Sequence, residues 1–120
     1  MSKLPSLQPV DYLLIGHVAV DLTPIGKQLG GTVSYSALTA KAMGLRVGIV
    51  TSAGEDAPLH VLDGIQIHNI PTDGSTIFEN IKTANGRKQT LHHRATPIQF
   101  EHIPEIWRDA PIVHLAPIAQ

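Results

Sequence analysis

The stretch "QLGGTVSYSALTAKAMG", residues 28–44, decides the fold class of this chain. Two adjacent glycines lead directly into small and hydroxylated residues, and Gly44 supplies the left-handed residue with which many helices end. The apolar positions that fall near one face are Val33, Ala37, Ala40 and the Ala42–Met43 pair. The pattern predicts a helix that begins after the double glycine and buries this face.

Dense apolar runs lie on both sides of this helix. Residues 12–15 end at Gly16, and residues 47–51 are followed by a glycine-rich turn. Such runs are typical of strands buried on both faces of a parallel sheet. Residues 10–51 therefore predict a βαβ unit with a parallel, right-handed crossover. The segment "DLTPIGKQL" inside this unit is interpreted as a short loop.

The rest of the chain continues the alternation. A short helix of two turns follows at "APLHVLDG", and the extended segments are residues 65–70, a hairpin at 76–95 and residues 111–115. The hairpin is centred on Asn85-Gly86, the strongest short hairpin signal, and "QFEHIPEIWRDA" suits a short helix. Residues 111–115 look like a central strand with little after them to cover it. We interpret the chain as the N-terminal part of a larger fold. The alternative is a domain that is completed by association through this uncovered sheet edge.

Composition restricts the function classes. The 120 residues are 42% hydrophobic and 16% charged, with a net charge of -1, which suits a single soluble globular domain. This balance argues against binding to nucleic acid or to an anionic membrane. The absence of cysteine excludes disulfides, thiolate metal sites and a cysteine nucleophile. No apolar run approaches the roughly 20 residues that a membrane helix needs. The N-terminal residues do not have the pattern of a secretory signal, so a cytoplasmic location is the default expectation.

Glycines at the start of a helix raise the question of a phosphate site. A P-loop would need a glycine at the position of Asp21 and Ser or Thr at the position of Gln28, and the dinucleotide motif GxGxxG is also absent. A helix N-terminus with two bare peptide units can still donate hydrogen bonds to an oxygen-rich ligand. A tight turn explains Gly30 and Gly31 equally well on this evidence.

Asp21 favours the ligand interpretation. It follows the carboxyl end of the first predicted strand, where ligands of open α/β sheets bind. A carboxylate accepts two hydrogen bonds and therefore suits a vicinal diol, and the donors Gly30 and Gly31 come nine residues later. Together these residues outline a polyol site.

The segment from Asp21 through "GGTVSYSALTAKAMGLRVGIVTSAGED" resembles the first signature of the ribokinase-like (PfkB) carbohydrate kinases. The matching positions are Gly30, Gly31, Ala37, Gly44, Gly54 and Asp56. The hairpin and the strand in "APIVHLAPIA" resemble later elements of that family, so the resemblance runs from about residue 10 to residue 119. It implies an α/β fold, namely the N-terminal part of a ribokinase-like three-layer α/β sandwich with a short β lid or hairpin. Residues 1–9 are expected to form a flexible leader, and residues 10–120 the substrate-binding part.

The resemblance also implies a function. Family members phosphorylate a sugar, a nucleoside or a related alcohol with ATP and Mg²⁺, and the residues equivalent to Asp21, Gly30 and Gly31 hold the substrate hydroxyls. Arg94, near the end of the second strand pair, would face the substrate. Tyr35 stands where the family often has a substrate-binding asparagine, which puts the identity of the substrate in question.

Two departures from the family limit these expectations. The segment "LTPIGKQL" looks too short for two full strands and a turn, which predicts a reduced lid and weaker dimerisation through it. The Gly-Ala-Gly-Asp motif that opens the catalytic half of the family is absent, and phosphoryl transfer needs a base, a donor and a metal site. We therefore expect no catalytic residue, no binding of ATP or Mg²⁺ and no kinase activity in this chain alone.

The sequence gives less support to other classes of function. The alternative is a non-catalytic α/β module that binds a polyol or assembles with a partner. The seven histidines lack the spacing of convergent metal ligands, and adjacent His92 and His93 point to opposite faces of a strand. Ser34 and Ser36 lie outside any nucleophile elbow, which argues against a hydrolase.

Overall fold

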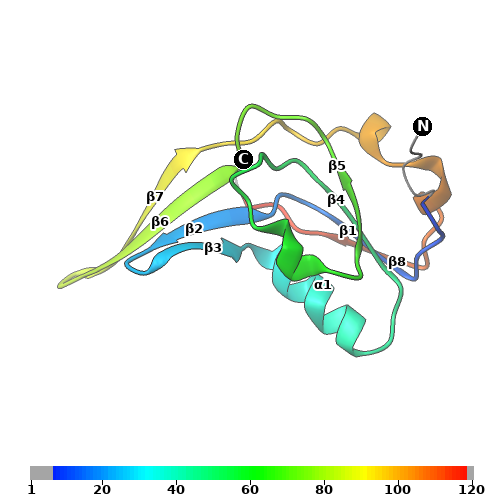
Figure 1. Ribbon diagram of the computed structural model, residues 1–120, viewed down its shortest axis with the longest axis horizontal. Helices are drawn as coiled ribbons and strands as arrows, with labels where there is room; N and C mark the ends of the chain where they lie inside the picture. The colour runs from blue at the N-terminus through cyan, green and yellow to red at the C-terminus, as the bar shows by residue number, and fades with distance from the viewer. Residues whose placement is uncertain (1–6, 119–120) are drawn as a thin grey trace.

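The computed structural model describes residues 7–118, which form two four-stranded sheets and one α-helix (Figure 1). The central sheet is parallel, with strand order β5-β4-β1-β8. Its strands are β1 (Tyr12–Ile15), β4 (Val47–Thr51), β5 (Gln66–Asn69) and β8 (Ile112–Leu115). The predicted βαβ unit is confirmed, because β1 and β4 pair in parallel and the helix lies between them in the sequence.

The second sheet extends away from the central sheet, towards the left of Figure 1. Its strand order is β3-β2-β6-β7, in which β2 and β6 are parallel and the other two pairs are antiparallel. Its strands are β2 (Ala19–Thr23), β3 (Gly26–Gly30), β6 (Thr76–Thr83) and β7 (Gly86–His93). The predicted hairpin at 76–95 therefore forms, and it belongs to this sheet.

The strands β2 and β3 correct the interpretation of "DLTPIGKQL" as a loop. They form a tight hairpin in which Thr23 pairs with Gly26, so the turn needs only two further residues. The Thr23 hydroxyl donates to the Gly26 carbonyl over 2.8 Å, and Gly26 has a φ of 127°, which favours glycine. The expectation that this segment is too short for two strands and a turn was wrong. Asp21 accordingly lies within β2 and not in a loop after β1.

Helix α1 (Thr32–Ala42) packs on one face of the central sheet through Val33, Ser34, Ala37 and Ala40. The predicted buried face of α1 is confirmed at Val33, Ala37 and Ala40. It is wrong at the end of the helix, where Ala42 and Met43 are exposed and Met43 retains 74% of its accessible surface. The buried Ser34 hydroxyl donates to the Gly30 carbonyl one turn earlier, over 2.9 Å. That bond satisfies a polar group inside the core.

The opposite face of the central sheet is covered by irregular structure around Trp107. The single short helix expected at 99–110 is replaced by two 3₁₀ turns, η2 (Phe100–His102) and η3 (Glu105–Trp107). Pro104 separates them, because proline has no N–H to donate and disfavours helical backbone at the residue before it. Trp107 is completely buried, and its indole N–H donates to the Gln8 carbonyl over 2.9 Å.

Two further segments complete the described chain. A third 3₁₀ turn, η1 (Leu59–Leu62), replaces the short helix expected after the Gly54–Asp56 turn, and it contacts α1. Of the expected leader, residues 1–6 lie outside the described residues, whereas Gln8 is hydrogen-bonded through its backbone N–H to the Gln66 side chain over 2.7 Å.

Strand β8 forms one edge of the central sheet. Three of its apolar side chains are exposed: Ile112 by 45%, Val113 by 49% and Leu115 by 68%. Since successive residues of a strand point to opposite faces, both faces of β8 are uncovered.

Candidate functional site

A polar pocket lies between one face of the second sheet and the start of α1. It has a volume of about 320 Å³. Its lining consists of Ala19, Asp21, Gly31, Thr32, Tyr35, Phe78, Asn80, Gln89 and Ile118. We call it the Asp21 pocket.

The strand register explains how Asp21 faces this pocket. Asp21 on β2 pairs with Phe78 on β6, so both side chains lie on the same face of the second sheet. Asn80 lies two residues further along β6 on that face, and it pairs directly with Gln89 on β7. Four pocket residues from three strands therefore share one sheet face.

Gly30 makes room for the Asp21 carboxylate. A Cβ atom at Gly30 would lie 2.1 Å from Oδ2 of Asp21, so any other residue would displace the carboxylate. Burial raises the pKa of Asp21 above its ordinary value, because a half-buried carboxylate loses part of its hydration. A ligand that donates hydrogen bonds to this carboxylate would offset that loss.

Gly31 has a different task, which is to turn the chain from β3 into α1. It is the residue before the helix, with φ of 91° and ψ of 152°, a conformation that is almost restricted to glycine. No side chain caps the helix N-terminus. This end of α1 carries a partial positive charge and borders the pocket through Gly31 and Thr32.

Tyr35 lies one turn into α1 and is 63% exposed. It lines the Asp21 pocket and also a neighbouring groove that contains Tyr12 and Ile112. Its phenol group can donate and accept a hydrogen bond at the mouth of the pocket.

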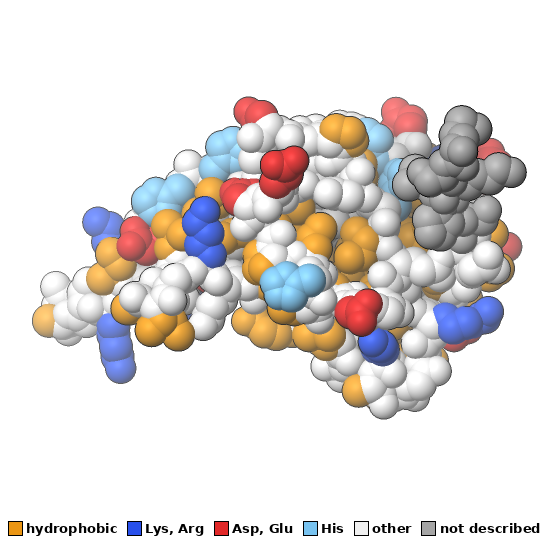
Figure 2. Space-filling model, viewed as in Figure 1, with side chains coloured by type: hydrophobic (Ala, Val, Ile, Leu, Met, Phe, Trp, Pro, Cys, Tyr) orange, Lys and Arg blue, Asp and Glu red, His pale blue; other side chains and the backbone are white. Residues whose placement is uncertain are grey.

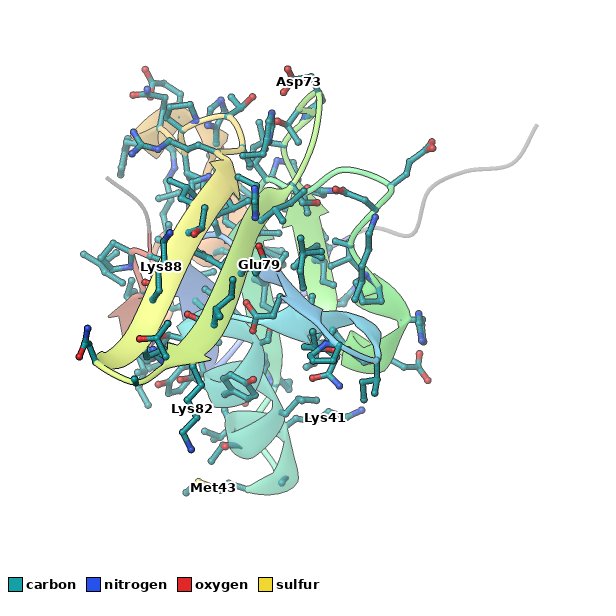
Figure 3. All side chains as sticks on the ribbon, turned by 90° about the vertical axis from the view of Figure 1, so that its left-hand side faces the viewer. Lys41, Met43, Asp73, Glu79, Lys82 and Lys88 are labelled. Atoms are coloured by element: carbon teal, nitrogen blue, oxygen red, sulfur yellow. The ribbon has the colours of Figure 1, made fainter. Side chains whose placement is uncertain are left out.

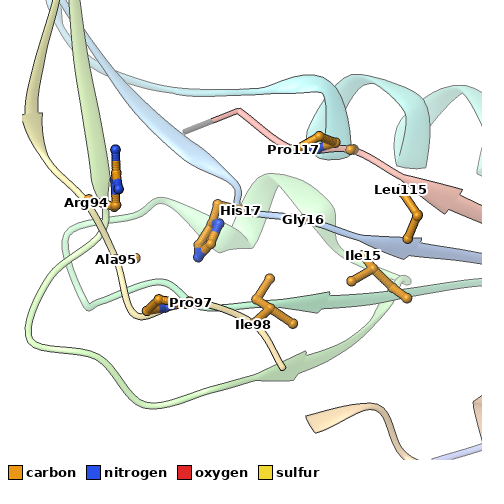
Figure 4. A pocket seen from close by; sticks show the side chains of 10 residues that line it. Ile15, Gly16, His17, Arg94, Ala95, Pro97, Ile98, Leu115 and Pro117 are labelled. Atoms are coloured by element: carbon orange, nitrogen blue, oxygen red, sulfur yellow. The ribbon is translucent and has the colours of Figure 1, made fainter. Parts of the chain in front are cut away.

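Arg94 lies in a second cavity, which we call the Arg94 cavity (Figure 4). This cavity has a volume of about 480 Å³ and a mostly apolar lining, to which Ile15, Ile98 and Leu115 contribute. His17 also lines it, with its Nε2 atom 2.8 Å from the Thr96 carbonyl oxygen. Although this cavity is the larger of the two, its apolar walls suit a hydroxyl-rich ligand less well than the Asp21 pocket does.

The structure thus brings Asp21, Gly31 and Tyr35 together in one pocket, with Gly30 directly beneath the carboxylate. It does not place Arg94 in that pocket. The role of Arg94 towards a substrate stays a prediction.

The sequence interpretation missed Asn80 and Gln89. The sequence signal for how these two strands pair was the turn at Asn85-Gly86. With these two residues at the centre of the turn, residue 80 would pair with residue 91. In the structure Thr83 pairs with Gly86, so the register differs by two residues and brings Gln89 opposite Asn80. A two-residue shift leaves each side chain on its own face of the hairpin, so the faces were predictable but the pairing was not.

A phosphoryl-transfer site needs groups for the phosphate donor and its metal ion besides those for the alcohol. Within residues 7–118 no three histidine, aspartate or glutamate side chains gather as metal ligands. No glycine-rich phosphate loop is present in the sequence either. We assign ATP and Mg²⁺ no ligands among residues 7–118.

Two surface properties bear on larger partners. Lys and Arg side chains are scattered over the face in Figure 2 and do not gather in a patch among the described residues there. In the described part of the chain, no helix combines the length and apolar character needed to cross a bilayer.

Comparison with solved structures decides the fold. A pyrophosphate-dependent kinase of the ribokinase family, in a sulfate complex, superimposes with a TM-score of 0.68 over 88% of this chain at 19% identity. The chain has part of the ribokinase-like fold.

Other ribokinase-like structures give the same result. A pyrophosphate-dependent kinase complexed with a pyrophosphate analogue and myo-inositol matches with a TM-score of 0.68 at 20% identity, and a nucleoside kinase of Methanocaldococcus jannaschii with 0.55 at 15% identity. Each match covers 88% of this chain. The chain spans only 41%, 40% and 44% of the lengths of these three ribokinase-like proteins. No protein-family profile and no curated protein sequence matches the chain.

Proposed function

We propose that this chain forms the substrate-binding part of a kinase that transfers a phosphoryl group to a hydroxyl of a sugar or related polyol. The observation that supports this function is the Asp21 carboxylate, held over Gly30 in a polar pocket that borders the N-terminus of α1. The ribokinase-like fold supplies the reaction class, since the compared proteins are kinases. A cytoplasmic location, expected from the sequence, belongs to the same proposal.

In this function the chain binds and orients the alcohol. Ionised Asp21 accepts hydrogen bonds from two neighbouring hydroxyls, the N-terminus of α1 donates to a third oxygen, and Tyr35 closes the open side. Fixing the reacting hydroxyl lowers the entropic part of the barrier to phosphoryl transfer. The catalytic base and the binding site for the phosphate donor, which is ATP with Mg²⁺ or pyrophosphate, would lie in the part of the ribokinase-like fold that this chain does not cover.

Calorimetric titration with myo-inositol, D-ribose and adenosine tests the proposal. We expect weak but measurable binding of at least one of these alcohols, and its loss in the Asp21→Asn variant, which keeps the size of the side chain. The absence of binding to all three would contradict the proposal. The chain alone should transfer no phosphoryl group from ATP or pyrophosphate, and clear turnover would contradict the assignment of catalysis to other residues.

One observation favours a second function, that of an assembly module. The exposed apolar side chains of β8 offer a sheet edge at which a further strand could pair. If the chain is a stable monomer that binds a polyol tightly, this result would favour a non-catalytic polyol-binding module over both the kinase part and the assembly module.

A further inference from the structure

The hairpin β6–β7 ends in a turn that takes no part in the proposed function. Thr83 pairs with Gly86, so Ala84 and Asn85 are the two residues of the turn. All four residues are exposed, and this end of the hairpin lies at the far left of Figure 1, away from the central sheet and α1. An asparagine is thus followed by a glycine at an exposed tip of the second sheet.

An asparagine followed by a glycine can change its own backbone. The Gly86 nitrogen attacks Cγ of Asn85, so that a nitrogen–carbon bond forms and the bond from Cγ to Nδ2 breaks. Nδ2 leaves as ammonia with the proton that the Gly86 nitrogen gives up, and a succinimide ring remains. Water then opens this ring at Cγ to give aspartate, or at the backbone carbonyl carbon to give isoaspartate. Glycine favours the attack because it has no side chain to obstruct it.

The structure distinguishes this turn from the two other places where an acid or amide side chain precedes a glycine in the sequence. These places are Asp63-Gly64 and Asp73-Gly74. A Cβ atom at Gly86 would meet no heavy atom within 4 Å. One at Gly64 would strike the end of the Lys41 side chain. One at Gly74 would lie 3.1 Å from the His93 ring. The space for a side chain to fold back onto the backbone nitrogen is therefore greatest at Gly86.

The charges around the turn also favour the attack. Lys82 and Arg87 are cross-strand partners next to the turn, and Lys88 follows Arg87 on β7. Figure 3 shows Lys82 and Lys88 on the two strands of the hairpin. The acid of the hairpin, Glu79, lies further from the turn and is paired with a histidine of β7. Positive charge stabilises the anion that forms when the Gly86 nitrogen loses its proton.

We propose that Asn85-Gly86 is a site of spontaneous deamidation, at which Asn85 is converted into aspartate and isoaspartate with water as the other reactant. This inference goes beyond the proposed function and does not depend on polyol binding. In the isoaspartate product the main chain runs through Cγ, so the turn gains a methylene group and a carboxylate beside its cations. The turn then loses the backbone spacing that pairs Thr83 with Gly86.

Mass spectrometry of the whole chain, followed by peptide mapping, tests the proposal. During incubation in mildly alkaline buffer, the mass should rise by the difference between an OH and an NH₂ group, first at Asn85. The two products have the same mass and should separate by chromatography, and the rate should rise with hydroxide concentration. Asn69 and Asn80, which are both followed by isoleucine, should keep their amides. Asn85→Gln should greatly slow the change, because its longer side chain has to close a larger ring.

The effect of charge has a matched control. Lys82→Gln and Arg87→Gln should each slow the loss of the amide by roughly 2-fold, the effect of removing one nearby unit charge in water. Arg108→Gln removes the same charge just after η3, far from this hairpin in Figure 1, and should leave the rate unchanged. Equal rates in all three variants would contradict the role of the cations. Circular dichroism verifies that each variant is folded.

Unfolding separates the contribution of the structure from that of the sequence. In guanidinium chloride the side chains that cover Gly64 and Gly74 move away. Isomerisation of Asp63 and Asp73 should therefore accelerate on unfolding more than deamidation of Asn85 does. If folding protects Asn85 as strongly as it protects these aspartates, or if another asparagine loses its amide first, the proposal is wrong.

Discussion

At the scale of single residues, the double glycine performs two separate tasks. Gly30 leaves space for the Asp21 carboxylate, whereas Gly31 has the backbone conformation that starts α1. The glycines are adjacent because the end of β3, the carboxylate on β2 and the start of the helix meet at this one corner. Their substitution should therefore have different consequences.

Gly30→Ala should weaken ligand binding and change stability little, because the added methyl displaces the end of a short, half-exposed side chain. Gly31→Ala should instead lower the free energy of unfolding by about 1–3 kcal/mol, the usual cost of such backbone strain. Urea unfolding and calorimetric titration of both variants provide the comparison. Equal losses of stability would contradict the division of tasks.

The pKa of Asp21 makes a second prediction at this scale. Burial raises the pKa of Asp21 in the folded state, so the folded chain holds this proton more tightly than the unfolded chain does. The contribution of Asp21 to stability must then fall as pH rises from the unfolded pKa through the folded pKa. Asp21→Asn should remove this decrease and raise stability at neutral pH.

Urea unfolding between about pH 3 and pH 7 measures the effect. Asp11→Asn serves as a contrast of opposite sign, because Arg46 lowers the pKa of Asp11 through hydrogen bonds from its side chain and backbone. Stability due to Asp11 is present above its unfolded pKa and is lost as pH falls through the folded pKa. Identical pH profiles for the two variants would show that Asp21 is not perturbed by burial.

At the scale of elements, the Gly54–Asp56 turn, which follows β4 of the central sheet, is hydrogen-bonded to the start of β6 in the second sheet. The Ser75 hydroxyl, just before β6, donates to Oδ1 of Asp56 over 2.6 Å and accepts from the Gly54 N–H over 2.8 Å. Ser75 is completely buried, so these bonds are shielded from water. The turn after β4 thereby holds the base of β6, and with it the face that carries Asn80.

Ser75→Ala should therefore destabilise the chain by about 1–2 kcal/mol, since it removes two hydrogen bonds of the Ser75 hydroxyl and leaves the half-buried Gly54 N–H without this acceptor, while Asp56 keeps the bond from the Ser75 backbone N–H. It should also weaken polyol binding although Ser75 does not line the Asp21 pocket. Ser36→Ala on α1 is the matched control for both measurements, by urea unfolding and calorimetry. Unchanged binding in a folded Ser75→Ala chain would show that the turn does not position β6.

At the scale of the whole molecule, the central sheet ends in a strand that is apolar on both faces. The matched ribokinase-like proteins are more than twice as long as this chain, and β8 is where its central sheet is uncovered. An exposed apolar edge strand favours pairing with another chain.

The isolated chain should accordingly associate as its concentration rises, and Val113→Lys should reduce this association by placing a charge on the edge strand. Val61→Lys is the matched control, because Val61 has a similar exposure, 45% against 49%, but lies on η1. Sedimentation velocity distinguishes the two variants. A monomeric wild-type chain, or equal effects of both lysines, would contradict association through β8.

The local sequence determined much of the fold. The apolar runs at β1 and β4, the helix between them and the hairpin β6–β7 follow from periodicity and turn residues, which act within a few positions along the chain. The two glycines and the Asp21 carboxylate could be selected as site candidates from the sequence, since their chemistry belongs to the residues themselves, and their role towards a ligand stays a prediction.

Only the tertiary structure decided which of these residues meet. The hairpin β2–β3 is extended into a sheet by β6, which pairs alongside β2. The sequence of so short a hairpin gives a weak strand signal by itself, because strand preference depends strongly on neighbouring strands. The same pairing carries Asn80 and Gln89 to Asp21, about sixty residues away in the sequence, and leaves Arg94 in a different cavity. Strand register and the contact between two sheets are long-range properties, because they depend on cross-strand partners that no local pattern specifies.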